Sequence, residues 1–141
     1  MDSGSSSRGV CFTTTTESEK SSEERWIIDS GCTKHMASST TSLGWWNPCT
    51  EKVTLADGKT VMAKGIGQGR ITGRGLEGTS LEIRVKELLF VPGLSANVLS
   101  VSRITDEGYS VRFGPNDCCI MDGETVIAVG EKYNGLYYLK Q

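Results

Sequence analysis

Residues 26–31 read Trp-Ile-Ile-Asp-Ser-Gly, an apolar run that ends at an acidic residue and a short turn sequence. Three large apolar side chains in succession predict a buried strand. Ser30-Gly31 predicts a tight turn after it, because glycine permits the bend and a serine hydroxyl can brace it. The tripeptide alone carries little information, since Asp2-Ser3-Gly4 repeats it in a polar segment. The apolar strand before Asp29 therefore distinguishes the second copy.

Downstream of this turn the sequence has mostly the patterns of β-strands. Val53 and Leu55 alternate with polar neighbours and lead to Asp57-Gly58, a dipeptide typical of hairpin turns. Asp122-Gly123 predicts a second hairpin, and residues 136–139 predict a final short strand. With roughly nine short strands and one helix, the pattern predicts a mostly β fold.

Two departures from simple alternation are predicted in the second half of the chain. The apolar positions of residues 81–85 and of residues 88–90 have opposite parity, which predicts a bulge near Lys86-Glu87. The apolar spacing over residues 95–107 predicts the helix, and Gly108 can end it.

The length of 141 residues fits one domain with a short extension. Residues 1–25 are rich in serine, threonine and charged side chains and have no hydrophobic period. This composition predicts a disordered polar leader or linker over residues 1–25 and a folded domain over residues 26–141.

Charge and cysteine content limit the classes of partner and compartment. The net charge is -2, which gives no electrostatic case for nucleic acid as a direct partner. No apolar run approaches the roughly 18 residues of a membrane span, so no membrane partner is expected. The five cysteines are odd in number and include an adjacent pair, which favours a reducing compartment over a disulfide framework.

From residue 26 to about residue 141 the chain resembles the protease of copia-type long-terminal-repeat retrotransposons. The order and spacing of four blocks carry this resemblance. The blocks are WIIDSGCTKHM (26–36), VTLADGKTV (53–61), LFVPGLSANVLSVSRITDEGYSVRF (89–113) and NGLYYL (134–139).

The resemblance implies a retropepsin-like acid-protease fold, which is homodimeric and mostly β, with one short helix in its C-terminal half. The C-terminal region beyond the minimal retroviral fold would add a β-hairpin. Asp29 of each subunit would activate water, Ser30 would supply the hydroxyl that ties the two active-site loops together, and Gly31 would complete the turn. The substrate would be the Gag-Pol precursor, cleaved in cytoplasmic virus-like particles without a metal or organic cofactor.

A flap and a supporting helix are also implied by the resemblance. The hairpin tip Ala56-Asp57-Gly58-Lys59 is the flap candidate, and Asn97-Val98-Leu99 corresponds to a short helix packed under the active site. Residues 65–69 are a competing flap because their glycine content is similar to retroviral flap tips. The spacing between flap and helix favours residues 56–59.

The sequence evidence for other kinds of site near Asp29 is weaker. Cys32 and His35 invite a metal interpretation, but a zinc site needs four ligands at matched spacing, and the remaining cysteines are scattered. The sequence favours a structural role for His35 and a small buried role for Cys32. Lys34 is a cation near the acidic turn, and a nearby cation lowers a carboxylate pKa.

Three readings of function remain open from the sequence. The first is a dimeric aspartic endopeptidase. The second is a host-adopted or inactive domain that keeps the fold for dimerisation or peptide binding. The third is a monomeric precursor form, because retroviral proteases place both chain ends in a shared intersubunit sheet, whereas this chain has a polar leader and a longer β tail.

Overall fold

The computed structural model describes residues 9–15, 24–55 and 57–141. Within these residues the chain forms strands and one short helix, so the predicted mostly β fold with a single helix is confirmed. The strands are β1 Val10–Thr14, β2 Trp26–Asp29, β3 Met36–Ala37, β4 Leu43–Thr54, β5 Thr60–Arg74, β6 Ser80–Phe90, β7 Asn97–Ser100, β8 Ser110–Phe113, β9 Asp117–Asp122, β10 Thr125–Tyr133 and β11 Leu136–Leu139, and α1 spans Val101–Asp106.

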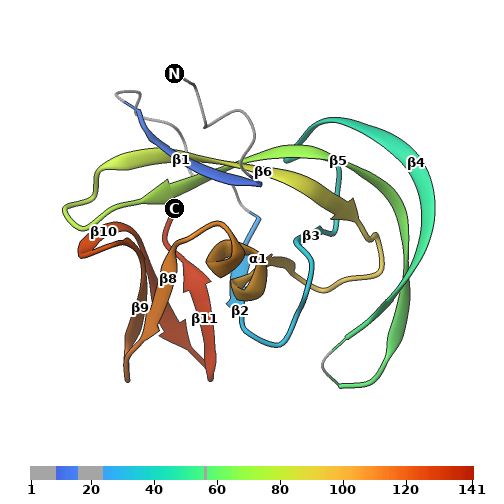
Figure 1. Ribbon diagram of the computed structural model, residues 1–141. Coiled ribbons are helices and arrows are strands. Elements are labelled where there is room, and N and C mark those ends of the chain that lie inside the picture. Colours follow the sequence, from blue (N-terminus) through green and yellow to red (C-terminus); the bar gives the residue numbers. More distant parts are fainter. Residues whose placement is uncertain (1–8, 16–23, 56) are drawn as a thin grey trace.

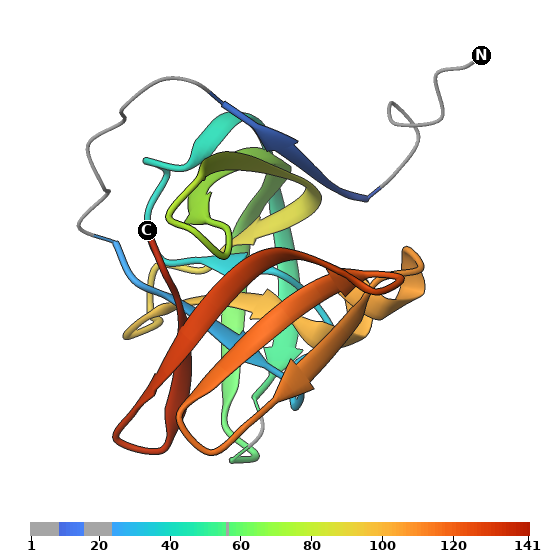
Figure 2. The same cartoon turned by 90° about the vertical axis from the view of Figure 1, so that its left-hand side faces the viewer.

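All the strands belong to one strongly curved sheet. Its order is β4-β5-β6-β3-β7-β2-β11-β10-β9-β8, and β1 pairs with β6 beside this path. The long strands β4, β5 and β6 form one antiparallel part, and β8 to β11 form another. Figure 1 shows β2 and α1 between these two parts, and Figure 2 shows β8 to β11 as a layer below β1.

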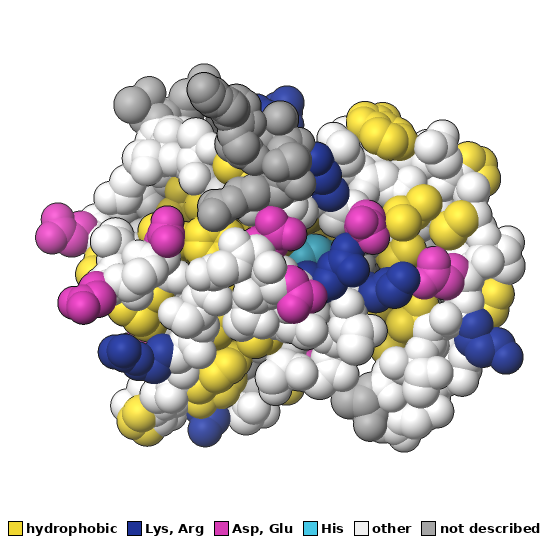
Figure 3. Space-filling model, viewed as in Figure 1, with side chains coloured by type: hydrophobic (Ala, Val, Ile, Leu, Met, Phe, Trp, Pro, Cys, Tyr) yellow, Lys and Arg dark blue, Asp and Glu magenta, His cyan; other side chains and the backbone are white. Residues whose placement is uncertain are grey.

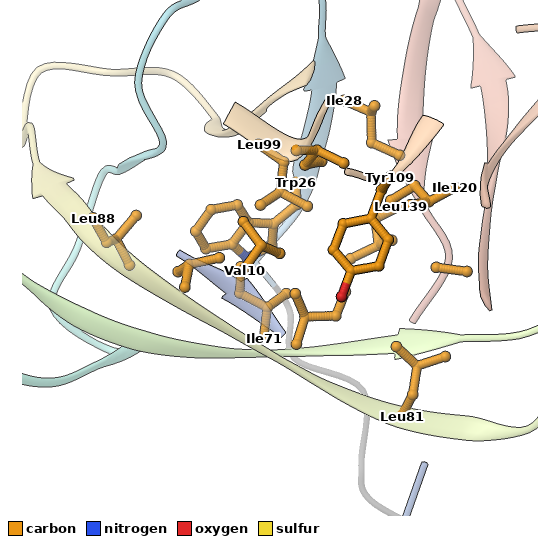
Figure 4. Packing of buried hydrophobic residues seen from close by; sticks show 14 of the residues in the cluster. Val10, Trp26, Ile28, Ile71, Leu81, Leu88, Leu99, Tyr109, Ile120 and Leu139 are labelled. Atoms are coloured by element: carbon orange, nitrogen blue, oxygen red, sulfur yellow. The ribbon is translucent and has the colours of Figure 1, made fainter. Parts of the chain in front are cut away.

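The core has two hydrophobic clusters. The larger one lies between the two antiparallel parts, and Figure 4 shows Val10, Ile71 and Leu99 gathered around the fully buried Trp26 ring. The smaller one joins the segment after Asp29 to β4 and β5, and its buried members are Cys32, Met36, Ala63, Leu89, Val91 and Val98. Both clusters therefore contact the chain on either side of Asp29.

The short strands in the middle of the sheet determine the path of the chain around Asp29. β2 runs parallel to β7, with Asp29 opposite Ser100, and β3 pairs with the other edge of β7 at Val98. Residues 30–35 therefore pass around the C-terminal end of β7. This crossing holds the predicted turn against a buried strand.

The predicted helix over residues 95–107 is wrong in its first half. Asn97, Val98 and Leu99 lie in strand β7, and the helix begins only at Val101, after the N-cap Ser100. All four residues of β7 are buried, because the strand lies between β2 and β3. A strand buried on both faces lacks polar alternation, so its sequence is indistinguishable from a short buried helix.

The predicted bulge near Lys86-Glu87 is confirmed. Leu88 pairs with Gly67 and Val85 with Gly69, so two residues of β6 lie opposite one residue of β5. Glu87 takes a positive φ of 55°, and its carboxylate pairs with Arg103 of α1 at 2.8 Å. The bulge therefore reverses the side-chain parity and also anchors the helix.

The predicted hairpin at Asp57-Gly58 is confirmed, while Ala56 lies outside the described residues. The Leu55 amide donates to the Lys59 carbonyl at 2.7 Å, and Gly58 has the positive φ of 88° that favours glycine. The alternative flap, residues 65–69, lies within β5 between β4 and β6 rather than at a tip. The hairpin predicted at Asp122-Gly123 is also present: Asp122 ends β9, and residues 123–124 connect it to β10.

The predicted disorder of residues 1–25 is wrong for Val10–Thr14, which forms β1 along the edge of β6. Val10 is 1% exposed and packs in the larger cluster with Phe12 at its margin. This short apolar stretch in a long polar segment gives too weak a sequence signal, but in the structure Val10 and Phe12 both pack on the larger cluster. The other parts of the leader, residues 1–8 and 16–23, lie outside the described residues.

Close contact between β4 and β5 explains one of the glycines in β5. A Cβ on Gly67 would overlap the Trp45 carbonyl oxygen and lie 2.6 Å from the Trp46 Cα, both backbone atoms. We therefore expect Gly67→Ala to lower the free energy of unfolding by about 2 kcal/mol or more. Gly93→Ala is the matched control, because a Cβ there meets nothing within 4 Å, and it should change stability by less than about 0.5 kcal/mol. Urea unfolding measures both, and equal stabilities of the two variants would contradict this account.

Candidate functional site

Asp29 is the last residue of β2, a strand in the middle of the sheet, and is half-buried. Its Oδ1 accepts a hydrogen bond from the Gly31 amide at 2.7 Å, and its Oδ2 accepts one from the Cys32 thiol at 3.3 Å. Each carboxylate oxygen thus has a donor within the same turn. The predicted residues Asp29, Ser30 and Gly31 form one compact acidic turn, with Ser30 and Gly31 exposed.

Ser100, the last residue of β7, connects this turn to the sheet through a hydrogen bond. It is fully buried, and its hydroxyl donates to the Cys32 carbonyl at 2.7 Å. The same hydroxyl accepts from the Arg103 amide at 3.2 Å, which caps α1. Sequence reasoning missed Ser100 as a site residue, although serine before an apolar helical pattern is a known N-cap signal.

His35 closes the segment that follows Asp29. It is 1% exposed, and its Nδ1 accepts a hydrogen bond from the Ser100 amide at 3.0 Å. Burial, assisted by the Arg103 charge, lowers the pKa of His35 to about 4, so the ring is neutral at pH 7. Figure 3 shows acidic and basic side chains around the histidine. The structural role predicted for His35 fits this geometry.

A shallow cavity of about 240 Å³ adjoins the Asp29 carboxylate. Asp29 and Ser30 line it from the end of β2 and the turn that follows, and Phe113, Leu136 and Tyr137 line it from β8 and β11. The Phe113 and Tyr137 rings meet edge to face at 4.8 Å, and the Tyr137 hydroxyl donates to the Gly114 carbonyl at 2.6 Å. Asp29 thus has an apolar aromatic wall beside it.

Sequence reasoning did not identify this wall. Phe113 and Leu136 remain 39% and 44% exposed beside the cavity. Only the packing of β11 against β2, at Tyr138 and Ile27, brings them to Asp29. A contact between segments this far apart in the chain leaves no local pattern in a single sequence.

The hairpin between β4 and β5 reaches the Asp29 turn through the smaller cluster. Val53, Leu55 and Val61 in its stem pack against the group that contains Cys32. Lys34, predicted as a cation near the turn, pairs with Glu51 of β4 at 2.8 Å. Figure 1 shows the Asp29 end of β2, the β4–β5 tip and the β10–β11 turn on the same side of the molecule.

The Cys32 thiol is protonated in this environment. Burial is the largest cause, and together with the hydrogen bond to Asp29 and the negative charge of that carboxylate it raises the pKa of Cys32 to about 12. A thiol with this pKa is a poor nucleophile and a poor metal ligand at neutral pH. It therefore acts as a hydrogen-bond donor to Asp29.

Two further observations limit the chemistry of the described residues. Over residues 9–15, 24–55 and 57–141, no group of three or more His, Cys, Asp and Glu side chains is placed to hold a metal ion. In the same part of the chain, no helix is long and apolar enough to cross a membrane.

The fold and this turn define a class: a mostly β, barrel-like domain that presents one oriented carboxylate beside an apolar wall. The chain belongs to the family described as Pol polyprotein, beta-barrel domain, which matches residues 26–109. That description gives the architecture and the polyprotein and names no catalytic activity.

Two plant polyproteins are similar to this chain. Over 121 residues it is 29% identical to the Retrovirus-related Pol polyprotein from transposon RE1 of Arabidopsis thaliana, covering 82% of this chain and 8% of that protein. The similarity to the corresponding protein of transposon RE2 is 29% over 117 residues, covering 79% of this chain and 8% of the relative. The chain thus spans a small part of each relative. No solved structure matches it.

The lowered pKa of His35 predicts a loss of stability in acid. The neutral ring is stabilised in the folded state, so its full contribution is present above pH 6.5 and is lost as the pH falls toward about 4. His35→Asn keeps an acceptor near the Nδ1 position and does not titrate. Between pH 7 and pH 5 we expect the wild type to lose on the order of 2 kcal/mol more than this variant. Urea unfolding at both pH values tests this, and equal losses would show that His35 is not the group responsible.

The contact between Cys32 and Asp29 predicts a change in thiol reactivity. Asp29→Asn removes the negative charge beside Cys32, which lowers the thiol pKa and should raise its rate of alkylation by iodoacetamide several-fold. Cys118 is the matched control, because burial, Cys119 and Asp117 raise its pKa to about 11 independently of Asp29. Peptide mass spectrometry gives both rates. A parallel increase at Cys118 would indicate general loosening of the fold instead.

Proposed function

We propose that this chain is the aspartic endopeptidase region of a retrotransposon Pol polyprotein, and that it cleaves peptide bonds of the Gag-Pol precursor. The single observation that carries the proposal is the Asp29 carboxylate, fixed by Gly31 and Cys32 at the end of a buried strand and next to a cavity. The family and the plant relatives support the polyprotein context. The activity itself is our inference from the turn and its resemblance to copia-type proteases.

The chemistry of this proposal needs a second carboxylate. Two carboxyl groups within hydrogen-bonding distance cannot both ionise cheaply, so they share one proton. The charged group takes a proton from water, and the protonated one donates to the oxygen of the scissile carbonyl. Both donors to Asp29 are neutral groups of its own turn, so the second carboxylate would come from Asp29 of another copy. A two-fold axis next to the turn supplies it directly.

The proposed dimer interface would not be built from strands exchanged between the two subunits. Both terminal strands pair within the chain, β1 with β6 and β11 with β2 and β10. An interface made of exchanged ends would have to displace these pairs. The exposed apolar side chains Phe113 and Leu136 lie beside Asp29 and suit an interface that brings two such turns together.

Substrate would bind as an extended strand beneath the hairpin at Asp57, Gly58 and Lys59. Its stem packs on the cluster that contains Cys32, which connects the hairpin with the acidic turn. Main-chain hydrogen bonds to an added strand would provide affinity with limited sequence dependence. Closure of the tip would exclude water from the shared carboxylates. We place this reaction in cytoplasmic virus-like particles.

Asp29→Asn provides the direct test. We expect the variant to cleave a precursor fragment with natural junctions about 10³-fold more slowly than the wild type, because the proton acceptor is gone. Asp122→Asn, at the exposed last residue of β9, is the matched control and should keep full activity. Wild-type activity should fall more steeply than enzyme concentration on dilution, since only dimers are complete.

Each other outcome has a definite meaning. Equal cleavage by wild type and Asp29→Asn would refute the catalytic assignment, and activity linear in concentration down to dilute enzyme would refute obligate dimerisation. If both proteins bind the fragment and neither cleaves it, the alternative of a non-catalytic peptide-binding domain holds. The apolar wall beside Asp29 is the observation that favours that alternative.

A further inference from the structure

A second concave surface lies on the outer face of β1, β6, β5 and β4, on the part of the sheet opposite the larger core. We name it the arginine groove; it has a volume of about 540 Å³ and is lined chiefly by Cys11, Trp45, Gln68, Arg70, Arg84 and Lys86. Alternate residues of β6 face the core, as the burial of Leu81, Ile83 and Val85 shows. The groove is therefore built from the side chains that face outward.

Two arginines stand opposite each other in this groove. Arg70 of β5 pairs in register with Arg84 of β6, and like charges directly across antiparallel strands destabilise a sheet. One carboxylate serves both: Glu82 Oε2 lies 3.2 Å from Arg70 Nε and 3.6 Å from Arg84 Nε. Two guanidinium groups against one carboxylate leave a net positive charge at this pair of arginines.

The two arginine side chains remain available to a ligand. They are 70% and 60% exposed, whereas Glu82 is 23% exposed. Ion pairs with such exposure contribute little stability, so the guanidinium groups can turn outward at small cost. Each guanidinium has a planar set of donors that fits a phosphate in two-point geometry.

Trp45 gives the groove a flat apolar element. It is 53% exposed on β4 although tryptophan is among the largest apolar side chains, and it lies opposite Gln68 of β5 in the same groove. Exposed aromatic rings beside cations are the combination that single-stranded nucleic acids use, with bases stacked on rings and phosphates on cations. An acidic peptide would use the arginines alone and would gain nothing from the indole face.

We propose that the arginine groove binds single-stranded nucleic acid, with backbone phosphates on Arg70 and Arg84 and a base stacked on Trp45. The net charge of -2 predicted no such partner, but net charge averages over the whole molecule while binding depends on the local distribution. The groove and the Asp29 cavity share no lining residues. The proposal therefore holds or fails independently of protease activity.

Fluorescence anisotropy with a labelled 12-nucleotide poly(U) RNA tests the proposal on the full 141-residue chain carrying Asp29→Asn, which avoids self-cleavage. We expect salt-dependent binding that Arg70→Gln with Arg84→Gln weakens about tenfold or more. The slope of log affinity against log salt should fall by about 1.4 in this double variant, since each lost phosphate contact removes about 0.7. Trp45→Ala should weaken binding several-fold while leaving the salt slope unchanged.

Arg112→Gln is the matched control, because Arg112 is an exposed arginine on β8, away from the groove, and its loss should change affinity less than twofold. Circular dichroism confirms that each variant is folded. The proposal is overturned if the Asp29→Asn protein without further changes does not bind the RNA at 50 mM salt, or if Arg112→Gln weakens binding as much as the double variant. Equal competition by a poly(Glu) peptide, with no effect of Trp45→Ala, would also overturn it and would identify an acidic peptide as the ligand.

Discussion

The parallel pairing of β2 with β7 is the constraint on which the rest of the site depends. It sets Asp29 opposite Ser100 at the point where β2 ends and the chain must turn. Ser100 then uses its amide, through His35, and its hydroxyl, through the Cys32 carbonyl, to hold the whole of residues 30–35. A buried serine can do this because each of its polar groups has a partner, and unpaired buried polar groups would cost far more.

From this centre the structure extends in two directions. Toward β4 and β5, the cluster around Cys32 connects the acidic turn with a hairpin whose tip is exposed. Toward β8 to β11, contact of β11 with β2 brings Phe113 and Leu136 to the carboxylate. Asp29 thus lies between the stem of a hairpin on one side and an aromatic wall on the other.

The proposed proton sharing by two carboxyl groups and the stability that neutral His35 gives to the turn have opposite pH requirements. Two carboxyl groups sharing a proton work only where one of them is protonated. The neutral His35 that supports the turn loses its stabilising effect as the pH falls, because its pKa in the folded protein is lowered to about 4. In the mechanism proposed above, catalysis and stability would therefore favour opposite directions of pH.

Local features of the fold were readable from the sequence. Features that depend only on neighbouring residues can be recognised in the sequence. They include the turns at Asp57-Gly58 and Asp122-Gly123, the parity change at Glu87 and the apolar strand that ends at Asp29. The blocks around Asp29 also indicated the Pol polyprotein family. Asp29 itself was predicted as the acidic group of the site from this local context.

Only the tertiary structure decided the rest. Asn97 to Leu99 form a strand instead of a helix because β2 and β3 pair with its two edges, and Val10–Thr14 is ordered because β6 offers an open edge. The aromatic wall, the Ser100 contacts and the arginine groove all join residues distant in the chain. Such contacts follow from how layers pack, and no local pattern records them. The sequence alone determined the acidic turn, whereas tertiary packing determined which residues surround it.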